Sequence, residues 1–239
     1  MILHLIVLRV FRRHARCRTL GAVPHDRVVL RTVDVAEVVP GEIAIVRVRR
    51  RWTELGETHV TGDVVDVRLD PATLGLEPLH MCTEDPEAPE PELEFLLAGR
   101  RTEPLPDELP SDAEHAAALL EVDLRCLAAH ARLGDEVFGR DPGDAVRYYE
   151  AGLRIGELSL CHLGGARLSA RYKDNLGFLR CLHGRARCRW RADCWAVAEH
   201  DLERLLALDP ADVLGAAAEL EAVRARRSWD HYLAIERVA

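Results

Sequence analysis

The sequence predicts an α+β protein in which a small β-rich domain precedes a purely helical one. Three observations support this: alternating Val-, Ile- and Thr-rich segments are confined to the first 81 residues, an acidic and proline-rich segment follows, and the remainder has apolar residues at helical spacing. We therefore expect three parts, a β-domain at residues 1–81, an extended linker at 82–110 and a helical domain at 111–239.

Composition and charge restrict the class of protein. An apolar share of 48% and a charged share of 30% are typical of a globular chain. The net charge of −8 is concentrated in residues 82–114, which carry about −9, whereas residues 1–81 carry about +2. No part is basic enough to predict nucleic-acid binding from charge alone.

The same features predict a cytoplasmic protein. The apolar N-terminus is short and its arginines follow the apolar run, the reverse of a secretory signal. No run is long enough to span a membrane, so we expect no membrane partner. The seven cysteines lack any CxxC spacing, which favours reduced thiols.

Four segments of the β-domain have strand composition, and two dipeptides between them, Pro40-Gly41 and Gly62-Asp63, suit turns. The segments are MILHLIVLRV (1–10), RVVLRTVDV (27–35), EIAIVRVRRRW (42–52) and THVTGDVVDVRL (58–69). Short strands with turns between them predict a small antiparallel sheet or an SH3-like barrel.

The helical domain reads as two helix pairs and a cap. Ser111, with Glu114 three residues later, fits a capping box and begins a helix that we expect to end at Gly134. Asp141-Pro142 then caps a helix over about 142–155. The second pair is expected at 176–191 and 194–208, followed by a helix at 211–226 and a tail that packs back on that last helix through Trp229, Tyr232 and Ile235.

The second helices of the two pairs share a spacing of small, large and small or apolar residues at 0, +4 and +7. These are Ala145, Tyr149 and Gly152 in the first pair, and Ala198, Leu202 and Leu205 in the second, where Pro210 follows at +12. A small residue allows two helices to approach closely, and the large one fills the groove of the neighbour. In this spacing the chain resembles tetratricopeptide-repeat proteins.

Longer segments resemble uncharacterised bacterial tetratricopeptide-repeat proteins that carry a small N-terminal β-domain. The segments are PGEIAIVRVRRRW with HVTGDV (40–52 and 59–64), DAVRYYEAGLRIGELSL (144–160) and DNLGFLRCLHG (174–184). The resemblance implies a β-domain joined to a repeat module of stacked helices, and it implies no activity.

Two groups of residues are candidate binding sites. Arg180, His183, Arg187 and Trp190 share one helical face, and first helices of repeat stacks line the concave surface. They predict a groove for another protein or an acidic peptide; a solvated face is the alternative. Arg47, Arg49, Arg50, Arg51 and Trp52 end one strand and predict single-stranded nucleic-acid binding, with a charge-protected edge strand as the alternative.

Enzymatic chemistry has weaker support. Cys181, His183, Cys188 and Cys194 could supply zinc ligands or a Cys–His nucleophile, but no short paired spacing frames a site. Phosphate-binding, dinucleotide-binding and hydrolase motifs are absent from the sequence. We expect a non-enzymatic protein-interaction or scaffold module without cofactor or metal, with nucleic-acid or ribonucleoprotein binding as the alternative.

Overall fold

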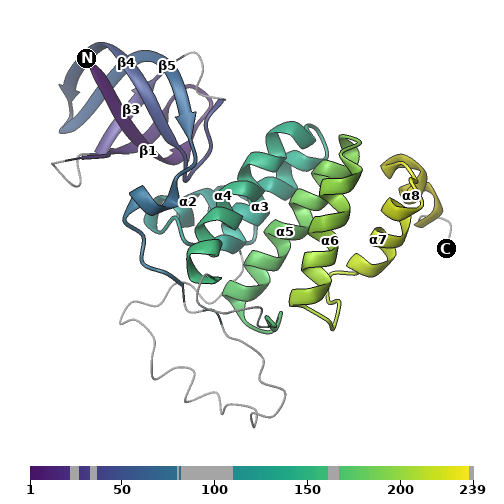
Figure 1. Cartoon of the computed structure of the whole chain (residues 1–239). Helices are drawn as coiled ribbons and strands as arrows, with labels where there is room; N and C mark the ends of the chain where they lie inside the picture. Colours follow the sequence, from purple (N-terminus) through teal and green to yellow (C-terminus); the bar gives the residue numbers. More distant parts are fainter. Residues whose placement is uncertain (22–26, 33–36, 80, 82–109, 161–166, 237–239) are drawn as a thin grey trace, which may run out of the picture.

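The computed structural model describes residues 1–21, 27–32, 37–79, 81, 110–160 and 167–236. Within them the chain forms a closed five-stranded barrel followed by seven α-helices, which confirms the α+β class (Figure 1). The barrel lies at one end of the molecule and the helices extend away from it (Figure 1). The expected linker at 82–110 lies, apart from its last residue, outside the described residues.

The barrel closes in the order β1-β2-β3-β5-β4. Its strands are β1 (Ile2–Val10), β2 (Ala15–Thr19), β3 (Arg27–Arg31), β4 (Ile43–Glu54) and β5 (Glu57–Arg68). Neighbouring strands are antiparallel except β3 and β5, which are parallel. Of the two expected forms, the antiparallel sheet is therefore wrong, because β4 pairs with β1 and β5 then returns parallel to β3, and the small β-domain is a closed barrel. The alternating apolar residues fill the interior, among them Leu5, Val7, Leu30, Val46 and Val60.

The expected turn at Gly62-Asp63 is wrong, since both residues lie within β5. A Cβ at Gly62 would lie 2.4 Å from the carbonyl oxygen of Arg47, so glycine is what permits the two strands to approach there. The turn between β4 and β5 instead uses Leu55 and Gly56, with φ of 50° and 81°.

The helices pack as successive neighbours, and α5 contacts α3, α4 and α6 (Figure 1). They are α2 (Ala113–Val122), α3 (Leu127–Phe138), α4 (Pro142–Leu160), α5 (Lys173–Arg191), α6 (Trp195–Leu208), α7 (Ala216–Arg224) and α8 (Trp229–Glu236). A short 3-10 helix, η2 (Pro71–Leu74), follows the barrel. The two expected helix pairs correspond to α3–α4 and α5–α6.

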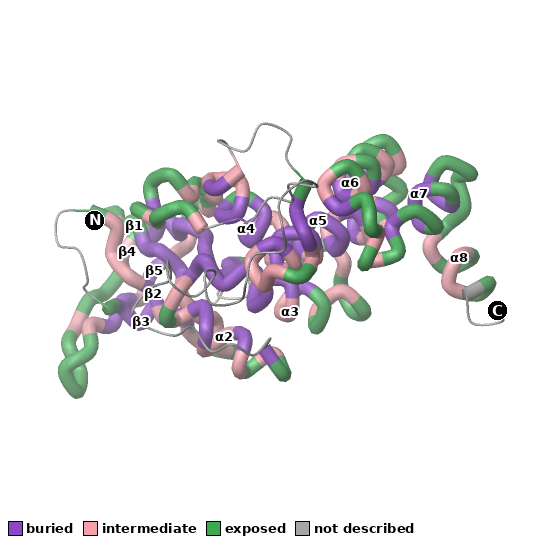
Figure 2. The backbone as a smooth tube through the Cα atoms, turned by 90° about the horizontal axis from the view of Figure 1, so that it is seen from below, coloured by how far each residue is buried: buried purple, intermediate pink, exposed green. Residues whose placement is uncertain are grey.

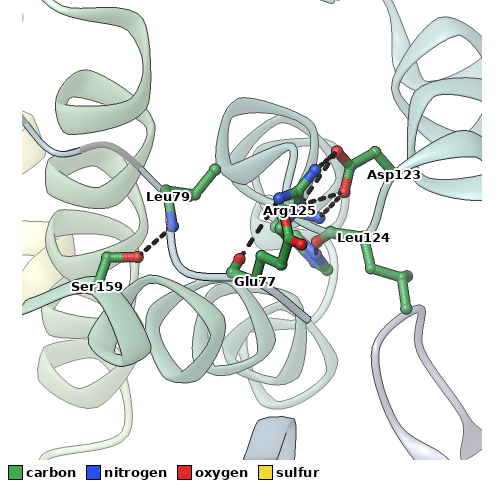
Figure 3. A network of polar contacts seen from close by, with 7 residues as sticks. Glu77, Leu79, Asp123, Leu124, Arg125 and Ser159 are labelled. Atoms are coloured by element: carbon green, nitrogen blue, oxygen red, sulfur yellow. Dashed lines mark hydrogen bonds and ion pairs between the residues drawn. The ribbon is translucent and has the colours of Figure 1, made fainter. Parts of the chain in front are cut away.

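The first expected helix is interrupted between α2 and α3. At Asp123 the backbone becomes extended, with φ −143° and ψ 108°. Its carboxylate accepts hydrogen bonds from the backbone N and the Nε of Arg125, both at 2.9 Å, and Arg125 also donates to the carbonyl of Glu77 at 3.4 Å (Figure 3). Such local bonds compete with helical hydrogen bonding. A single helix continuing to Gly134 is therefore wrong.

The helix caps agree with the sequence in one case and differ in the other. The carboxylate of Asp112 accepts from the backbone N of His115 at 2.7 Å, so the cap of α2 is Asp112 and not Ser111. Asp141 caps α4 as predicted, accepting from the backbone N of Asp144 at 3.0 Å.

The small-large-small spacing has the packing role that the sequence predicts. Tyr149 is 1% exposed, and Gly152 lies so near α5 that a Cβ would be 2.6 Å from Sγ of Cys181. The Tyr149 ring lies between Gly134 of α3 and Gly184 of α5, where added Cβ atoms would be 2.5 Å and 2.2 Å from its Cε1. Three helices therefore meet on one aromatic ring.

A loop of the barrel enters the helical part. Gly41 has φ 93°, and a Cβ there would be 3.4 Å from Cδ1 of Ile155 and 3.5 Å from Cε1 of His130. Next to it, the buried carboxylate of Glu42 accepts from Nη2 of Arg147 at 2.7 Å. Burial raises the pKa of Glu42 although Arg147 opposes the change. Buried backbone accordingly runs from the barrel into α4 and α5 (Figure 2).

Candidate nucleic-acid interface

The predicted groove residue Trp190 lies in the interior. It is 1% exposed, and its Nε1 donates to the carbonyl of Arg227 at 2.8 Å. Its ring meets those of Trp229 and Tyr232, with centroids 5.0 Å and 5.1 Å away. Trp229 and Tyr232 of the C-terminal segment thus pack on a ring of α5, whereas the sequence predicted packing on the helix that precedes the segment. Ile235 is 46% exposed, so the packing expected of it is not seen.

The three polar groove residues contact carboxylates of the chain itself. Nε2 of His183 lies 2.7 Å from Glu219 of α7, Nε of Arg187 donates to the same carboxylate at 2.8 Å, and Arg180 lies 2.6 Å from Asp135 of α3. Burial by itself raises the pKa of Glu219, but His183 and Arg187 outweigh it and lower that pKa. Only parts of two side chains, 30% of Arg180 and 37% of Arg187, stay open to solvent.

The candidate residues of β4 do not share one face. They are Arg47, Arg49, Arg50, Arg51 and Trp52. The pairing of β4 with β5 shifts at Arg49, whose Nη2 lies 2.7 Å from Asp63. Beyond this bulge Arg50 and Trp52 point to the same side and Arg51 to the other. The guanidinium of Arg50 lies 5.3 Å from the Trp52 ring centroid. β4 pairs with both β1 and β5 as far as Arg47, but Arg50, Arg51 and Trp52 pair with β5 alone, so the charge-protected edge remains an alternative for this end of the strand.

Strand register places Trp52 in a row that crosses four strands. Trp52 pairs with His59 of β5, His59 with Val29 of β3, and Val29 with Arg16 of β2. These residues alternate with those of the barrel interior, so they point outward, but Val29 and His59 are only 7% and 6% exposed and lie beneath their neighbours. The rings of Trp52 and His59 stack with centroids 5.2 Å apart and planes at 16°.

A second row lies beside the first. Arg50 pairs with Thr61 of β5, and Thr61 pairs with Arg31 of β3. The guanidinium of Arg31 is 6.0 Å from the Trp52 ring centroid, so two arginines from different strands approach one indole.

The turn between β1 and β2 contributes a further aromatic stack. Phe11 and His14 stack with centroids 4.5 Å apart, and the guanidinium groups of Arg9 and Arg16 lie 4.8 Å and 5.5 Å from the Phe11 centroid. Burial, then the charges of Arg31 and Arg16, lower the pKa of His14. Arg16 joins this turn to the first row, because it contacts the Phe11 ring and pairs with Val29.

These groups form one surface, which we call the basic–aromatic face. It consists of Phe11, His14, Arg16, Arg31, Arg50, Trp52 and His59. Guanidinium groups bind phosphate through paired N–H donors, and aromatic or guanidinium planes stack on bases. Among the described residues no group of three or more His, Cys, Asp or Glu is arranged to hold a metal ion.

Five members of the face were not predicted from the sequence: Phe11, His14, Arg16, Arg31 and His59. A local signal existed for one strand, because Arg16 alternates with the buried Ala15 and Cys17. The other residues come together only because β2, β3, β5 and β4 are neighbours in the barrel, and this strand order could not be read from the sequence.

Comparisons with known protein families, with curated proteins and with solved structures find no match to this chain. The structure places the chain in the α+β class, with a closed barrel followed by packed helices. None of the helices within the described residues is both long enough and apolar enough to cross a membrane.

Proposed function

We propose that the chain binds single-stranded nucleic acid across the basic–aromatic face. The observation that carries this proposal is the convergence of Arg16, Arg31 and Arg50 with the Trp52–His59 stack, from four strands, on one outer surface. Cationic grooves combined with stacking side chains are how proteins hold single strands without reading their sequence.

The dimensions of the face suit a strand that crosses the sheet. Arg16 and Trp52 are separated by three strand-to-strand steps, which amounts to about 14 Å at about 4.8 Å per step. Arg12 and Arg13, both exposed in the β1–β2 turn, would extend the positive charge beyond Phe11. The overall charge of −8 does not oppose this, since the acidity is concentrated in residues 82–114.

The barrel also resembles the OB fold in its five closed strands and parallel β3–β5 pair. Barrels of that class bind oligonucleotides on the second and third strands and on the loops that follow the first and fourth strands. The basic–aromatic face occupies the corresponding positions here. A similar fold does not by itself imply the same function, so the proposal rests on the residues of the basic–aromatic face.

The protein-binding groove expected on α5 has less support. His183 and Trp190 are buried against α7 and the C-terminal segment, which leaves the exposed parts of Arg180 and Arg187 to meet a partner. Both guanidinium groups already contact carboxylates, so an acidic peptide would have to displace them. Among the proposals from the sequence, nucleic-acid binding therefore fits the arrangement better.

Fluorescence anisotropy with labelled 12-nucleotide oligo-U and oligo-dT tests the proposal. For about three phosphate contacts, made by Arg31, Arg50 and an exposed arginine of the β1–β2 turn at about −0.7 each, the dissociation constant should rise roughly 18-fold between 50 and 200 mM KCl. The double variant Arg31→Gln/Arg50→Gln should bind about 25-fold more weakly at 0.1 M salt, with a salt slope reduced by about 1.4. Trp52→Ala should weaken binding at least about fivefold and leave the slope unchanged.

A matched control removes two guanidinium groups from the helical part. Arg132→Gln/Arg154→Gln deletes charges that pair with glutamates on α3 and α4, away from the barrel. It should leave both affinity and slope unchanged. If both double variants weakened binding equally, the loss of affinity would come from the change in net charge and not from the basic–aromatic face. No binding of the unsubstituted chain at 50 mM KCl would refute the proposal.

A further inference from the structure

A carboxylate of the helical part contacts the basic–aromatic face. Oε1 of Glu121, near the end of α2, lies 2.8 Å from Nη1 of Arg16, and its Oε2 lies 3.4 Å from Nη1 of Arg9. The Glu121 side chain is 14% exposed and that of Arg16 is 43% exposed. Arg9 also contacts Glu114, which lies two turns earlier on the same face of α2.

The contact lies where a bound strand would cross β2 and β3. Glu121 lines a small cleft between α2 and the barrel together with Arg16, Arg27, Val29 and Glu57. Arg16 thus belongs to the face through its register with Val29 and to the α2 contact through Glu121. The Glu121 carboxylate and a phosphate of a bound strand would therefore compete for the guanidinium group of Arg16.

We infer that Glu121 limits the affinity of the basic–aromatic face for polyanions by competing for Arg16. This inference rests on the proposed function and adds a residue that sets its strength. The charges of Arg9, Arg16, Glu114 and Glu121 sum to zero, so this part of the face releases few counterions while α2 is seated. A phosphate that takes Arg16 from Glu121 therefore weakens the contact between α2 and the barrel, which couples nucleic-acid binding to the helical part.

The substitution Glu121→Gln gives the expected size of the effect. It leaves Arg16 free to make one further phosphate contact, which at about −0.7 in salt slope corresponds to about fivefold tighter binding at 0.1 M salt. Anisotropy titrations of the full chain with the same oligo-U should show this gain and a slope steeper by about 0.7.

Three further variants separate the mechanism from charge and stability. Glu114→Gln makes the same charge change on a side chain that is 83% exposed and contacts only Arg9 of the pair, so it should alter affinity less than twofold. In the Arg16→Gln background, Glu121→Gln should give no gain, and this double variant leaves neither Arg16 nor Glu121 as an unpaired charge. Circular dichroism checks that each variant is folded.

The outcomes are distinct. A fivefold gain that disappears with Arg16→Gln supports the inference. A gain that persists without Arg16, an equal gain from Glu114→Gln, or no gain at all would overturn it while leaving nucleic-acid binding intact. Failure of the unsubstituted chain to bind oligo-U or oligo-dT would instead remove the proposed function.

Discussion

Replacing Gly184 by alanine tests whether α3, α4 and α5 are held together by the slot around one tyrosine. A Cβ at Gly184 would lie 2.2 Å from Cε1 and 2.3 Å from Cζ of Tyr149. The ring is also closely approached from α3, where a Cβ at Gly134 would be only 2.5 Å from the same Cε1. The hydroxyl is also fixed, since it donates to Oδ1 of Asp135 at 2.8 Å.

The expected magnitude follows from opposing contributions. Alanine in place of glycine inside a helix gains about 1 kcal/mol of propensity. Overpacking costs about 1–3 kcal/mol, and a shift of the ring that breaks its bond to a charged carboxylate costs a further ~1.5–3 kcal/mol. We expect a net loss of about 1.5–5 kcal/mol in the free energy of unfolding, or a Tm lower by about 3–20 °C for a chain of this size.

Urea unfolding followed by circular dichroism provides the measurement. Gly139→Ala is the matched control, because Gly139 has helical dihedrals and an added Cβ meets nothing within 4 Å. It should be neutral or stabilising by up to about 1 kcal/mol. In a Tyr149→Ala background, Gly184→Ala should no longer destabilise. Equal stability of the Gly184→Ala and Gly139→Ala variants would show that the close packing around Tyr149 does not hold α3, α4 and α5 together.

Three further predictions concern buried groups. Burial lowers the pKa of His130 to about 4, so the unfolded chain, with a pKa of about 6.5, binds the extra proton between these values. The free energy of unfolding should fall by up to about 3 kcal/mol as the pH drops from 6.5 to 4, and His130→Gln should flatten that part of a urea-unfolding pH series; an unchanged slope would contradict this. Iodoacetamide at pH 8 should label the exposed Cys194 within minutes but spare Cys17, whose pKa burial raises to about 12; peptide mass spectrometry measures both, and equal labelling in the folded chain would disprove it. Trp229→Ala should remove the edge-on contact with Trp190 and shift the indole emission to longer wavelength, whereas an unshifted spectrum would mean that the C-terminal segment does not shield that ring.

The division into a β-domain and a helical domain could be read from the sequence because both depend on local periodicity. Strand residues such as Ile45 and Val46 alternate, and the spacing of Ala145, Tyr149 and Gly152 is a helical one. The break at Asp123 escaped prediction, since the apolar spacing continues through it and the competing bonds come from side chains.

The candidate site was predicted only in part, for a physical reason. Arg50 and Trp52 stand out locally, but their neighbours Arg31 and His59 reach them through pairing across the barrel. The opposite error concerns α5, where a basic helix suggested a surface. The partner of Arg187, Glu219, lies on a helix that follows 32 residues later, and sequence spacing carries no sign of such a pair.

The loop at Gly41 has a consequence for the order in which this chain can be completed. Glu42 and its partner Arg147 are separated by 105 residues. At a synthesis rate of about 5–20 residues per second, the ribosome needs roughly 5–20 s to make the second after the first. During that interval a buried carboxylate and an apolar loop of the newly made barrel have no helices to cover them. The barrel therefore emerges before the surface that finishes it, and it is completed only when α3 and α4 arrive.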